Sequence, residues 1–218
     1  MAVVNKPPVL ISSASLDATF SGDGLTSIAI GVGSDQARGI AIQSDGRYVV
    51  AGWSDAGGGN YDFAVVRFNT DGSLDSSFSG DGKQTTSIGA GADKAYGVAI
   101  QSDGRIVVAG STHNGSNDDF AIVRYNANGS LDTGFSGDGI QTTSFSASDD
   151  DVTALAIQAD GKILAVGTSN TSFAVARYDS TGLLDSTFDT DGRHTGKFDS
   201  SNSVANAIAL QSDGKIIV

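Results

Sequence analysis

The sequence predicts an all-β fold of antiparallel four-stranded units that repeat as the blades of a β-propeller. An apolar hairpin with an Asp-Gly turn recurs at residues 41–52, 99–110, 156–167 and 209–218. A Leu-Asp pair recurs in steps of 58, 57 and 53 residues, at Leu16, Leu74, Leu131 and Leu184. No segment shows a helical period, and β-branched residues fill the apolar runs. A β-sandwich is the main alternative, but it does not need the same turn at the same offset each time.

Each unit begins with a hairpin. In the first copy, residues 38–43 alternate, with Ile40 and Ile42 on one face, and this pattern predicts the first strand. Asp45-Gly46 supplies the positive φ that a two-residue type I′ turn requires. Residues 48–52 are apolar on both faces, as expected of a second strand buried between neighbours.

The rest of the unit predicts a third and a fourth strand. Residues 62–69 form the third strand, and a turn at residues 70–72 ends it. Residues 74–82 then cross over to an outer strand at residues 83–88, which alternates. The third copy departs from this pattern in a shortened loop at residues 169–172.

The first and last copies are incomplete, so the sequence predicts about 3.5 to 4 repeats. Residues 25–30 occupy an outer-strand position, and residues 204–218 supply a hairpin without its later strands. We expect a ring closed by pairing these two segments, with residues 9–12 as a third strand, or an edge covered by another chain. The alternative is that the chain is a fragment of a longer array and part of a larger ring. Residues 1–15 are expected to be a linker or edge segment. Residues 16–218 are expected to form one repeat domain, with units beginning near residues 16, 74, 131 and 184.

Composition narrows the classes of partner. Thirteen basic against 25 acidic residues give a net charge of −12, which disfavours nucleic acid and anionic membranes. The absence of cysteine excludes disulfides, thiolate catalysis and cysteine zinc sites. No apolar run reaches the length of a membrane span, and no signal peptide is visible.

The repeated motifs carry a family resemblance. They read Leu-Asp-x-x-Phe, Asp-Gly-Lys, Ala-Ile-Gln-x-Asp-Gly-Lys/Arg-Ile-Val-Val-Ala-Gly and Phe-Ala-x-x-Arg-Tyr-Asn. From about residue 16 to residue 218 the chain resembles the delta-60 repeat family of bacterial proteins. This resemblance implies a β-propeller-like fold and a place in large exported or surface proteins. It implies no particular activity, because the family has none generally assigned.

An arginine recurs at one offset in the third strand, at Arg67, Arg124 and Arg177. We predict that it pairs with the aspartate of the Leu-Asp motif as a charge-assisted latch across the crossover, at Asp75, Asp132 and Asp185. The functional alternative is a ring of arginines that binds an anion. A residue present in every unit is expected to build the blade, which favours the latch.

A calcium site is the most specific chemical hypothesis for the acidic loops. The alternative is that their carboxylates are only solvated. Residues 189–192 form an Asp-x-Asp-Gly run, and residues 117–119 and 149–151 are further acidic clusters. Alternating carboxylates on a tight loop can converge on one hard cation. No complete EF-hand pattern with its terminal glutamate is present. No metal ligand is therefore assigned, and calcium stays a possible cofactor only.

A few residues break the repeat and are candidates for a specific site: Trp53, Tyr61, Tyr96, His113, His194 and Lys197. Aromatic and polar side chains on loops at one propeller face can form a shallow sugar or peptide site. The alternative is that Trp53 caps the core. The two histidines lie in different units and make a poor metal set.

These observations favour a non-enzyme, with no catalytic or cofactor-binding residue assigned. The chain has no Gly-x-Ser-x-Gly and no His-Glu-x-x-His motif. We expect a non-catalytic propeller module of a larger exported or surface protein that serves as a structural or interaction scaffold. The alternative is a carbohydrate-binding or adhesive module, with or without dependence on calcium, and a glycan-acting enzyme ranks third. A protein or glycan ligand and strand pairing with another chain are the expected partners.

Overall fold

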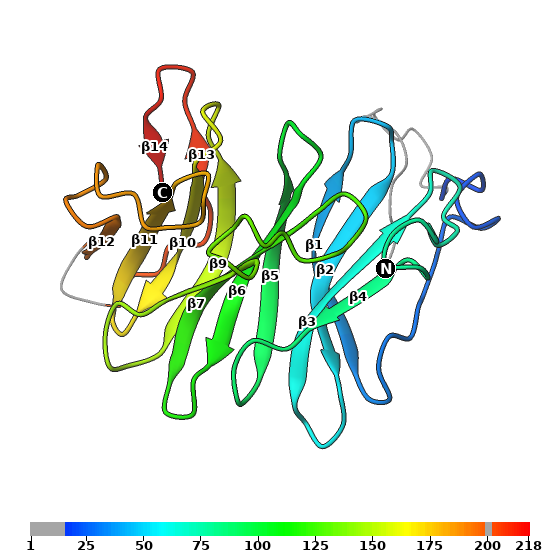
Figure 1. Cartoon of the computed structure of the whole chain (residues 1–218), viewed down its shortest axis with the longest axis horizontal. Coiled ribbons are helices and arrows are strands. Elements are labelled where there is room, and N and C mark those ends of the chain that lie inside the picture. Colours follow the sequence, from blue (N-terminus) through cyan, green and yellow to red (C-terminus); the bar gives the residue numbers. More distant parts are fainter. Residues whose placement is uncertain (1–15, 199–201) are drawn as a thin grey trace.

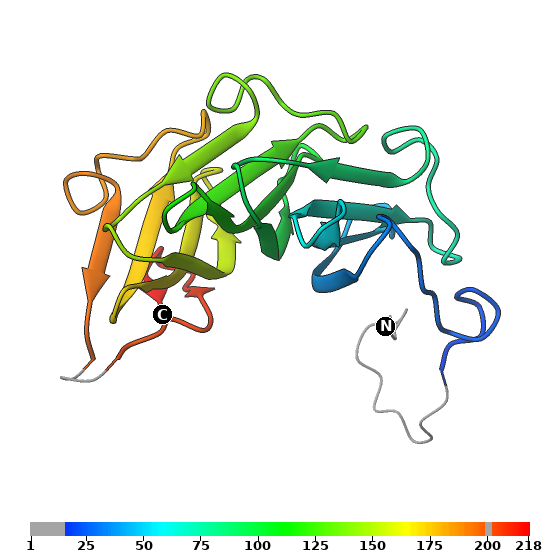
Figure 2. The ribbon, with the colours of Figure 1, turned by 90° about the horizontal axis from the view of Figure 1, so that it is seen from below.

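The computed structural model describes residues 16–198 and 202–218, which form an arc of β-sheets (Figures 1 and 2). Three sheets have four antiparallel strands each, and a fourth has two. Each four-stranded sheet follows the chain order from inner to outer strand. No helix in this part of the chain is long and apolar enough to cross a membrane.

The strands recur blade by blade. Blade I contains β1 (Asp35–Ile42), β2 (Tyr48–Asp55), β3 (Tyr61–Phe68) and β4 (Lys83–Thr86). Blade II contains β5 (Asp93–Ile100), β6 (Ile106–His113), β7 (Asp118–Tyr125) and β8 (Ile140–Thr143). Blade III contains β9 (Asp150–Ile157), β10 (Ile163–Ser169), β11 (Ser172–Tyr178) and β12 (Arg193–Gly196). The last unit contributes β13 (Ala209–Leu210) and β14 (Ile216–Ile217). The predicted all-β propeller blades are thus confirmed.

The outer strand is shorter than the sequence predicts. It ends at Thr86 instead of residue 88, because the next backbone donors turn to a side chain. The amide of Ile88 donates to Asp93 Oδ2 at 2.6 Å, and the amide of Gly89 to its Oδ1 at 3.2 Å. Conversely, β1 begins three residues earlier than predicted and β2 extends three residues further, since the two pair as far as Asp35 and Ser54.

The inner strand of each four-stranded sheet carries a bulge. The register with the second strand shifts so that one residue has no partner, at Arg38, Tyr96 and Thr153. The bulge brings the inner-strand backbone onto the second strand, where a Cβ on Gly110 would lie 2.0 Å from the Lys94 carbonyl. This contact is the reason why the recurrent Val-Ala-Gly segment ends in glycine.

The core lies between the blades. Val49, Val65 and Phe63 of blade I pack against Val108 and Tyr125 of blade II in one cluster of buried side chains. The phenol of Tyr125 lies 2.7 Å from the hydroxyl of the preceding blade's Thr86, so the buried polar tip is satisfied. Blades II and III repeat the arrangement through a second such cluster.

The expected ring closure by residues 25–30 and 204–218 is wrong. Residues 26–30 form no strand, and Ile28 and Ile30 pack against blade I with Tyr48 and Phe68. Among the described residues, β13 and β14 pair only with each other, at the other end of the arc. The packed cores set the angle between blades and hold the two segments apart. The predicted strand at residues 9–12 and the segment of residues 1–15 lie outside the described residues.

A tight turn after the third strand contacts the preceding blade. The amide of Ser79 donates to the carbonyl of Asn128 at 2.7 Å. Gly129, with φ of +92°, lies so close that an added Cβ would be 2.9 Å from the Ser79 nitrogen. The same contact recurs at Gly72 with Ser21.

We predict that Gly129→Ala destabilises the chain by about 2–3 kcal/mol, because it adds a clash between blades to the strain of positive φ. Gly104→Ala is the matched control, since Gly104 has φ of +85° with no atom near its Cβ position. It is expected to cost only about 1 kcal/mol. Urea unfolding at constant m-value measures the free energy of unfolding of both variants. An equal decrease in the two would contradict a stabilising role for the contact between Gly129 and the preceding blade.

Candidate functional site

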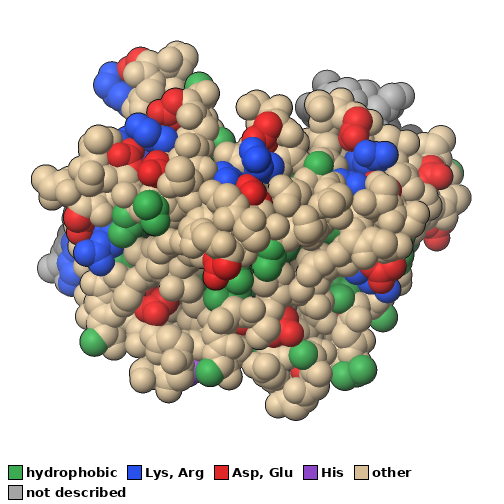
Figure 3. All heavy atoms as spheres, viewed as in Figure 1, with side chains coloured by type: hydrophobic (Ala, Val, Ile, Leu, Met, Phe, Trp, Pro, Cys, Tyr) green, Lys and Arg blue, Asp and Glu red, His purple; other side chains and the backbone are tan. Residues whose placement is uncertain are grey.

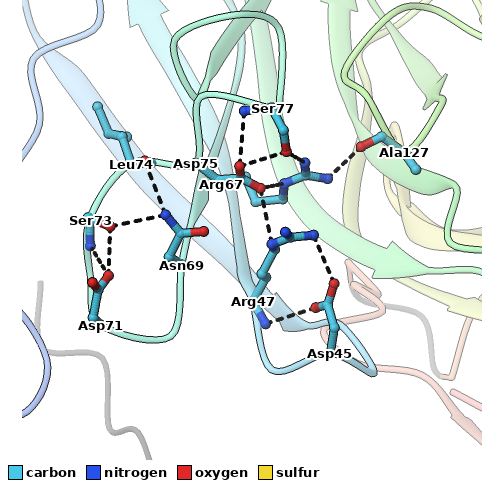
Figure 4. Close-up of polar contacts among 10 residues, drawn as sticks. All are labelled: Asp45, Arg47, Arg67, Asn69, Asp71, Ser73, Leu74, Asp75, Ser77 and Ala127. Carbon is cyan, nitrogen blue, oxygen red and sulfur yellow. Dashed lines mark hydrogen bonds and ion pairs between the residues drawn. The ribbon is translucent and has the colours of Figure 1, made fainter.

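The recurrent arginine forms the predicted latch. In blade I, Arg67 Nε donates to Asp75 Oδ2 at 2.7 Å, and its Nη2 donates to the Ser77 hydroxyl at 3.0 Å (Figure 4). The guanidinium also lies 4.9 Å from the centre of the Phe78 ring. The equivalent Nε–Oδ2 distances are 2.8 Å in blades II and III, for Arg124–Asp132 and Arg177–Asp185.

A second cation completes each latch, and the sequence reasoning missed it. The residue after the Asp-Gly turn reaches the same carboxylate, with Arg47 Nε 3.2 Å from Asp75 Oδ2 (Figure 4). Its counterparts lie 2.9 and 3.3 Å from their carboxylates, in the pairs Arg105–Asp132 and Lys162–Asp185. The recurrent Lys/Arg in the Asp-Gly-Lys/Arg motif was the available signal. Figure 3 shows blue and red side chains close together along the upper edge of the molecule.

The latch also joins neighbouring blades. Arg67 Nη1 donates to the carbonyl of Ala127 in blade II at 2.5 Å. Arg124 Nη1 donates to the carbonyl of Ser180 in blade III at 2.7 Å. These guanidinium groups are therefore engaged in building the scaffold, which argues against the alternative of an anion-binding ring.

One latch carboxylate has a strongly lowered pKa. The Thr187 hydroxyl, followed by the Thr187 amide, Lys162 and Arg177, lowers the pKa of Asp185 to about 2 against the opposing effect of burial. Its side chain is only 8% exposed. Folding thus favours the ionised form of this carboxyl group.

Asp185→Asn is predicted to reduce the acid sensitivity of folding. Because the pKa falls from 3.8 to about 2 on folding, the ionised group stabilises the chain fully above pH 4. That stabilisation is lost as the pH falls through about 2. The variant should be less stable than the wild type at pH 6. Its free energy of unfolding, measured in urea, should fall less steeply between pH 4 and pH 2. Asp160→Asn, which removes the exposed partner of Lys162, is the comparison. Against the effect of desolvation, the Lys162 amide and side chain lower the pKa of Asp160, so this variant should also flatten the slope, but less than Asp185→Asn because Asp160 is exposed.

The non-repeated residues gather at the opposite, loop end of the inner strands. At the bulge position, the three blades carry Arg38, Tyr96 and Thr153. Two residues earlier they carry Gln36, Lys94 and Asp151, which pair with Trp53, Ser111 and Thr168 of the second strands. The backbone is the same in each blade, so these side chains differ without any change in fold.

Aromatic and cationic side chains connect blades I and II in this cluster. The Arg38 guanidinium lies 4.7 Å from the centre of the Trp53 ring. Trp53 in turn makes an edge contact with Tyr96 of blade II, with ring centres 5.5 Å apart. Lys94 lies 5.6 Å from the centre of the Tyr61 ring. Trp53 is buried, with 6% of its surface exposed, while Arg38 is exposed.

Carboxylates extend the cluster to blade III. The Ser111 hydroxyl donates to Asp151 at 2.9 Å. Burial, together with the nearby charges of Asp118 and Asp149, raises the pKa of Asp151. Burial also raises the pKa of Tyr96, and the Asp151 charge adds to the effect. We define the loop-end cluster as Arg38, Trp53, Tyr61, Lys94, Tyr96 and Asp151.

The structure separates the remaining candidates from this cluster. His113 lies at its border, where Nδ1 is 2.7 Å from Asp118 Oδ1. His194 is on the outer strand β12 of blade III, 2.5 Å from Asp189, and Lys197 follows it. Sequence reasoning found Trp53, Tyr61 and Tyr96, missed Arg38 and Lys94, and named Asp151 only within an acidic run proposed for calcium. A position-by-position comparison of the first strands would have shown that these positions vary.

The acidic runs proposed for calcium are engaged with protein donors. Asp189 faces His194, and Asp191 accepts hydrogen bonds from the Arg193 amide and side chain. Asp150 accepts from the amide of Phe145 at 2.7 Å. Within residues 16–198 and 202–218, no three His, Asp or Glu side chains are placed to hold one metal ion.

Comparison with models of known protein families supports the β-propeller fold. Residues 43–78, 101–135 and 158–188 match the model described as "Domain of unknown function (DUF5122) beta-propeller". Three successive repeats of the chain are thus similar to this β-propeller repeat family. Each matched segment runs from the hairpin through the latch to the crossover phenylalanine, and the resemblance to a bacterial propeller-like repeat is confirmed. A search of curated proteins gives no match.

Solved structures of other proteins are only distantly similar to this chain. An inactive variant of virginiamycin B lyase from Staphylococcus aureus with quinupristin has a TM-score of 0.47 at 12% identity, covering 84% of this chain and 48% of that one. A protein of unknown function from Bacteroides caccae has a TM-score of 0.47 at 14% identity, covering 88% and 58%. Selenomethionine-substituted virginiamycin B lyase from Staphylococcus aureus has a TM-score of 0.38 at 12% identity, covering 83% of this chain and 61% of that one. The chain thus spans about half to three fifths of these proteins.

Proposed function

We propose that this chain is a non-catalytic β-propeller module that binds a partner through the loop-end cluster. The observation that carries the proposal is the division between the two ends of the blades. Repeated charged residues are engaged in latches at one end, whereas Arg38, Tyr96, Lys94 and Asp151 vary from blade to blade at the other. A scaffold needs identical contacts, and a specific site needs side chains that differ.

The chemistry of the cluster fits a polar partner with some apolar surface. Arg38 and Tyr96 offer a charged and an aromatic group side by side, the residue types that dominate protein interfaces. A polypeptide partner is therefore the first candidate. A glycan is the second, because Tyr61 and Tyr96 supply aromatic rings next to hydrogen-bonding carboxylates and cations.

The single tryptophan of the chain provides a direct reporter of binding. Trp53 touches both Arg38 and Tyr96, so a ligand that displaces either is predicted to change its fluorescence. Labelled protein is first applied to peptide and glycan arrays, and each hit is titrated by Trp53 fluorescence. Tyr96→Ala should weaken binding at least about tenfold, the loss of a hot-spot contact. Phe198→Ala removes an exposed ring on blade III and is the control, expected to bind normally.

The outcomes separate the candidate functions. Peptide hits lost in Tyr96→Ala support the scaffold, and glycan hits lost in the same variant support the carbohydrate-binding alternative. Binding that disappears on addition of EDTA would establish calcium dependence. Ligands that bind Tyr96→Ala as tightly as the wild type would exclude the loop-end cluster as the binding site. Release of reducing sugar from a bound glycan would contradict the non-catalytic assignment.

We further propose that the module belongs to a larger exported or surface protein of a bacterium, as the family resemblance implies. In that case, brief protease treatment of intact source cells should remove the epitope of an antibody raised against this chain. A cytoplasmic protein probed in parallel controls for lysis. An epitope that is destroyed only after lysis would overturn this placement.

A further inference from the structure

The two ends of the arc present complementary halves of a blade. At one end, residues 16–30 supply a crossover and an outer segment that dock on blade I. The Phe20 ring is fully buried there, and the Ser21 amide donates to the Asp71 carbonyl at 2.8 Å, as in the contacts between complete blades. At the other end, β13 and β14 supply the two inner strands of a blade.

In the described part of the chain, no inner strands cover the face of blade I next to residues 16–30. Ile40 and Ile42 are paired with Val50 and Tyr48, so all four side chains share this face. Ile40 is 45% and Ile42 is 62% exposed. Their counterparts in blade II, Val98 and Ile100, pack against the cluster shared with blade I.

A cleft of about 210 Å³ marks the unfilled position. Its walls include apolar side chains of blade I and of the docked segment, among them Val50, Ala64, Val66, Phe68, Ile28 and Ile30, with Asp35 and Gln36 among its polar lining residues. Facing strands of a neighbouring blade cover the corresponding side chains in blades II and III.

The far end of the arc carries the matching surface. Ile217 of β14 is 50% exposed. The residues at the same position of the other hairpins face the next blade and are fully buried, at Val49, Val107 and Leu164. Ile217 thus lies on a face that, in every other unit, is covered by the blade that follows.

We propose that two copies of this chain associate head to tail, with β13–β14 of one copy seated on the open face of blade I of the other. The inner strands of one copy and the outer segment of its partner then share a composite blade. The described residues leave the third-strand position of that blade open. This inference is independent of the proposed function.

The shape of the arc permits closure by two copies. Figure 2 shows an arch whose two ends point the same way, so a two-fold axis can bring both pairs of ends together. Each copy contributes three complete blades and its share of a composite one. Two copies would give a ring of eight blades, within the range of known propellers, about four to eight. Because each copy carries a charge of −12, association should strengthen with salt.

Sedimentation velocity of the 218-residue chain over a range of concentrations and salt tests the proposal. The wild type should approach about 44 kDa, twice its mass of 22.0 kDa. Ile42→Lys and Ile217→Lys should each give 22.0 kDa species. Their melting temperatures should not fall below that of the dissociated wild type, because both side chains are exposed in the single copy. Leu183→Lys alters a leucine that is 57% exposed away from both ends and should still dimerise.

Mixing the two variants tests the head-to-tail geometry. One keeps an intact β13–β14 face and the other an intact blade I face, so the mixture can form one junction and should regain part of the dimer. A wild type that stays at 22.0 kDa would overturn the proposal. Loss of the dimer in Ile42→Lys but not in Ile217→Lys would indicate a symmetric contact of blade I and overturn it too. Open polymers would overturn the two-copy ring.

Discussion

The packing of each blade on the next is the interaction on which the structure depends. A four-stranded sheet has two faces, and the second and third strands here are apolar on both. Such strands are stable only when both faces are covered. Val107 and Ile122 of blade II lie in the cluster shared with blade III, while Val108 and Val123 lie in the cluster shared with blade I. On blade I the face that carries Ile40 and Ile42 is only partly covered by the described residues.

The latches give this packing its alignment. A buried ion pair contributes little net stability, because desolvation offsets much of the attraction. Its directional hydrogen bonds, however, fix which segments meet. Asp75 holds the hairpin through Arg47 and the third strand through Arg67, and Arg67 reaches the backbone of blade II. The latches therefore connect the hairpin, the crossover and the neighbouring blade at one end of each blade. The side chains at the other end, the loop end, differ from blade to blade.

Variation at the loop end is compatible with the fold because the bulge is a backbone feature. Gly52, Gly110 and Gly167 allow the inner strand to approach in each blade, whatever side chain the bulge presents. Arg38, Tyr96 and Thr153 can therefore differ while the bulge stays the same. A propeller built this way separates the residues that hold it together from those available for recognition.

The sequence by itself determined the strands, the Asp-Gly turns, the repeat and the Arg67–Asp75 latch, because each follows from local periodicity or from recurrence at a fixed offset. It also indicated Trp53, Tyr61 and Tyr96 as exceptions to the repeat. Only the tertiary structure decided that Arg38, Lys94 and Asp151 join them, since the three lie on different blades that meet near the axis. It also decided that residues 25–30 and 204–218 stay apart, because the angle between blades is set by side-chain packing across sheets and not by any local pattern.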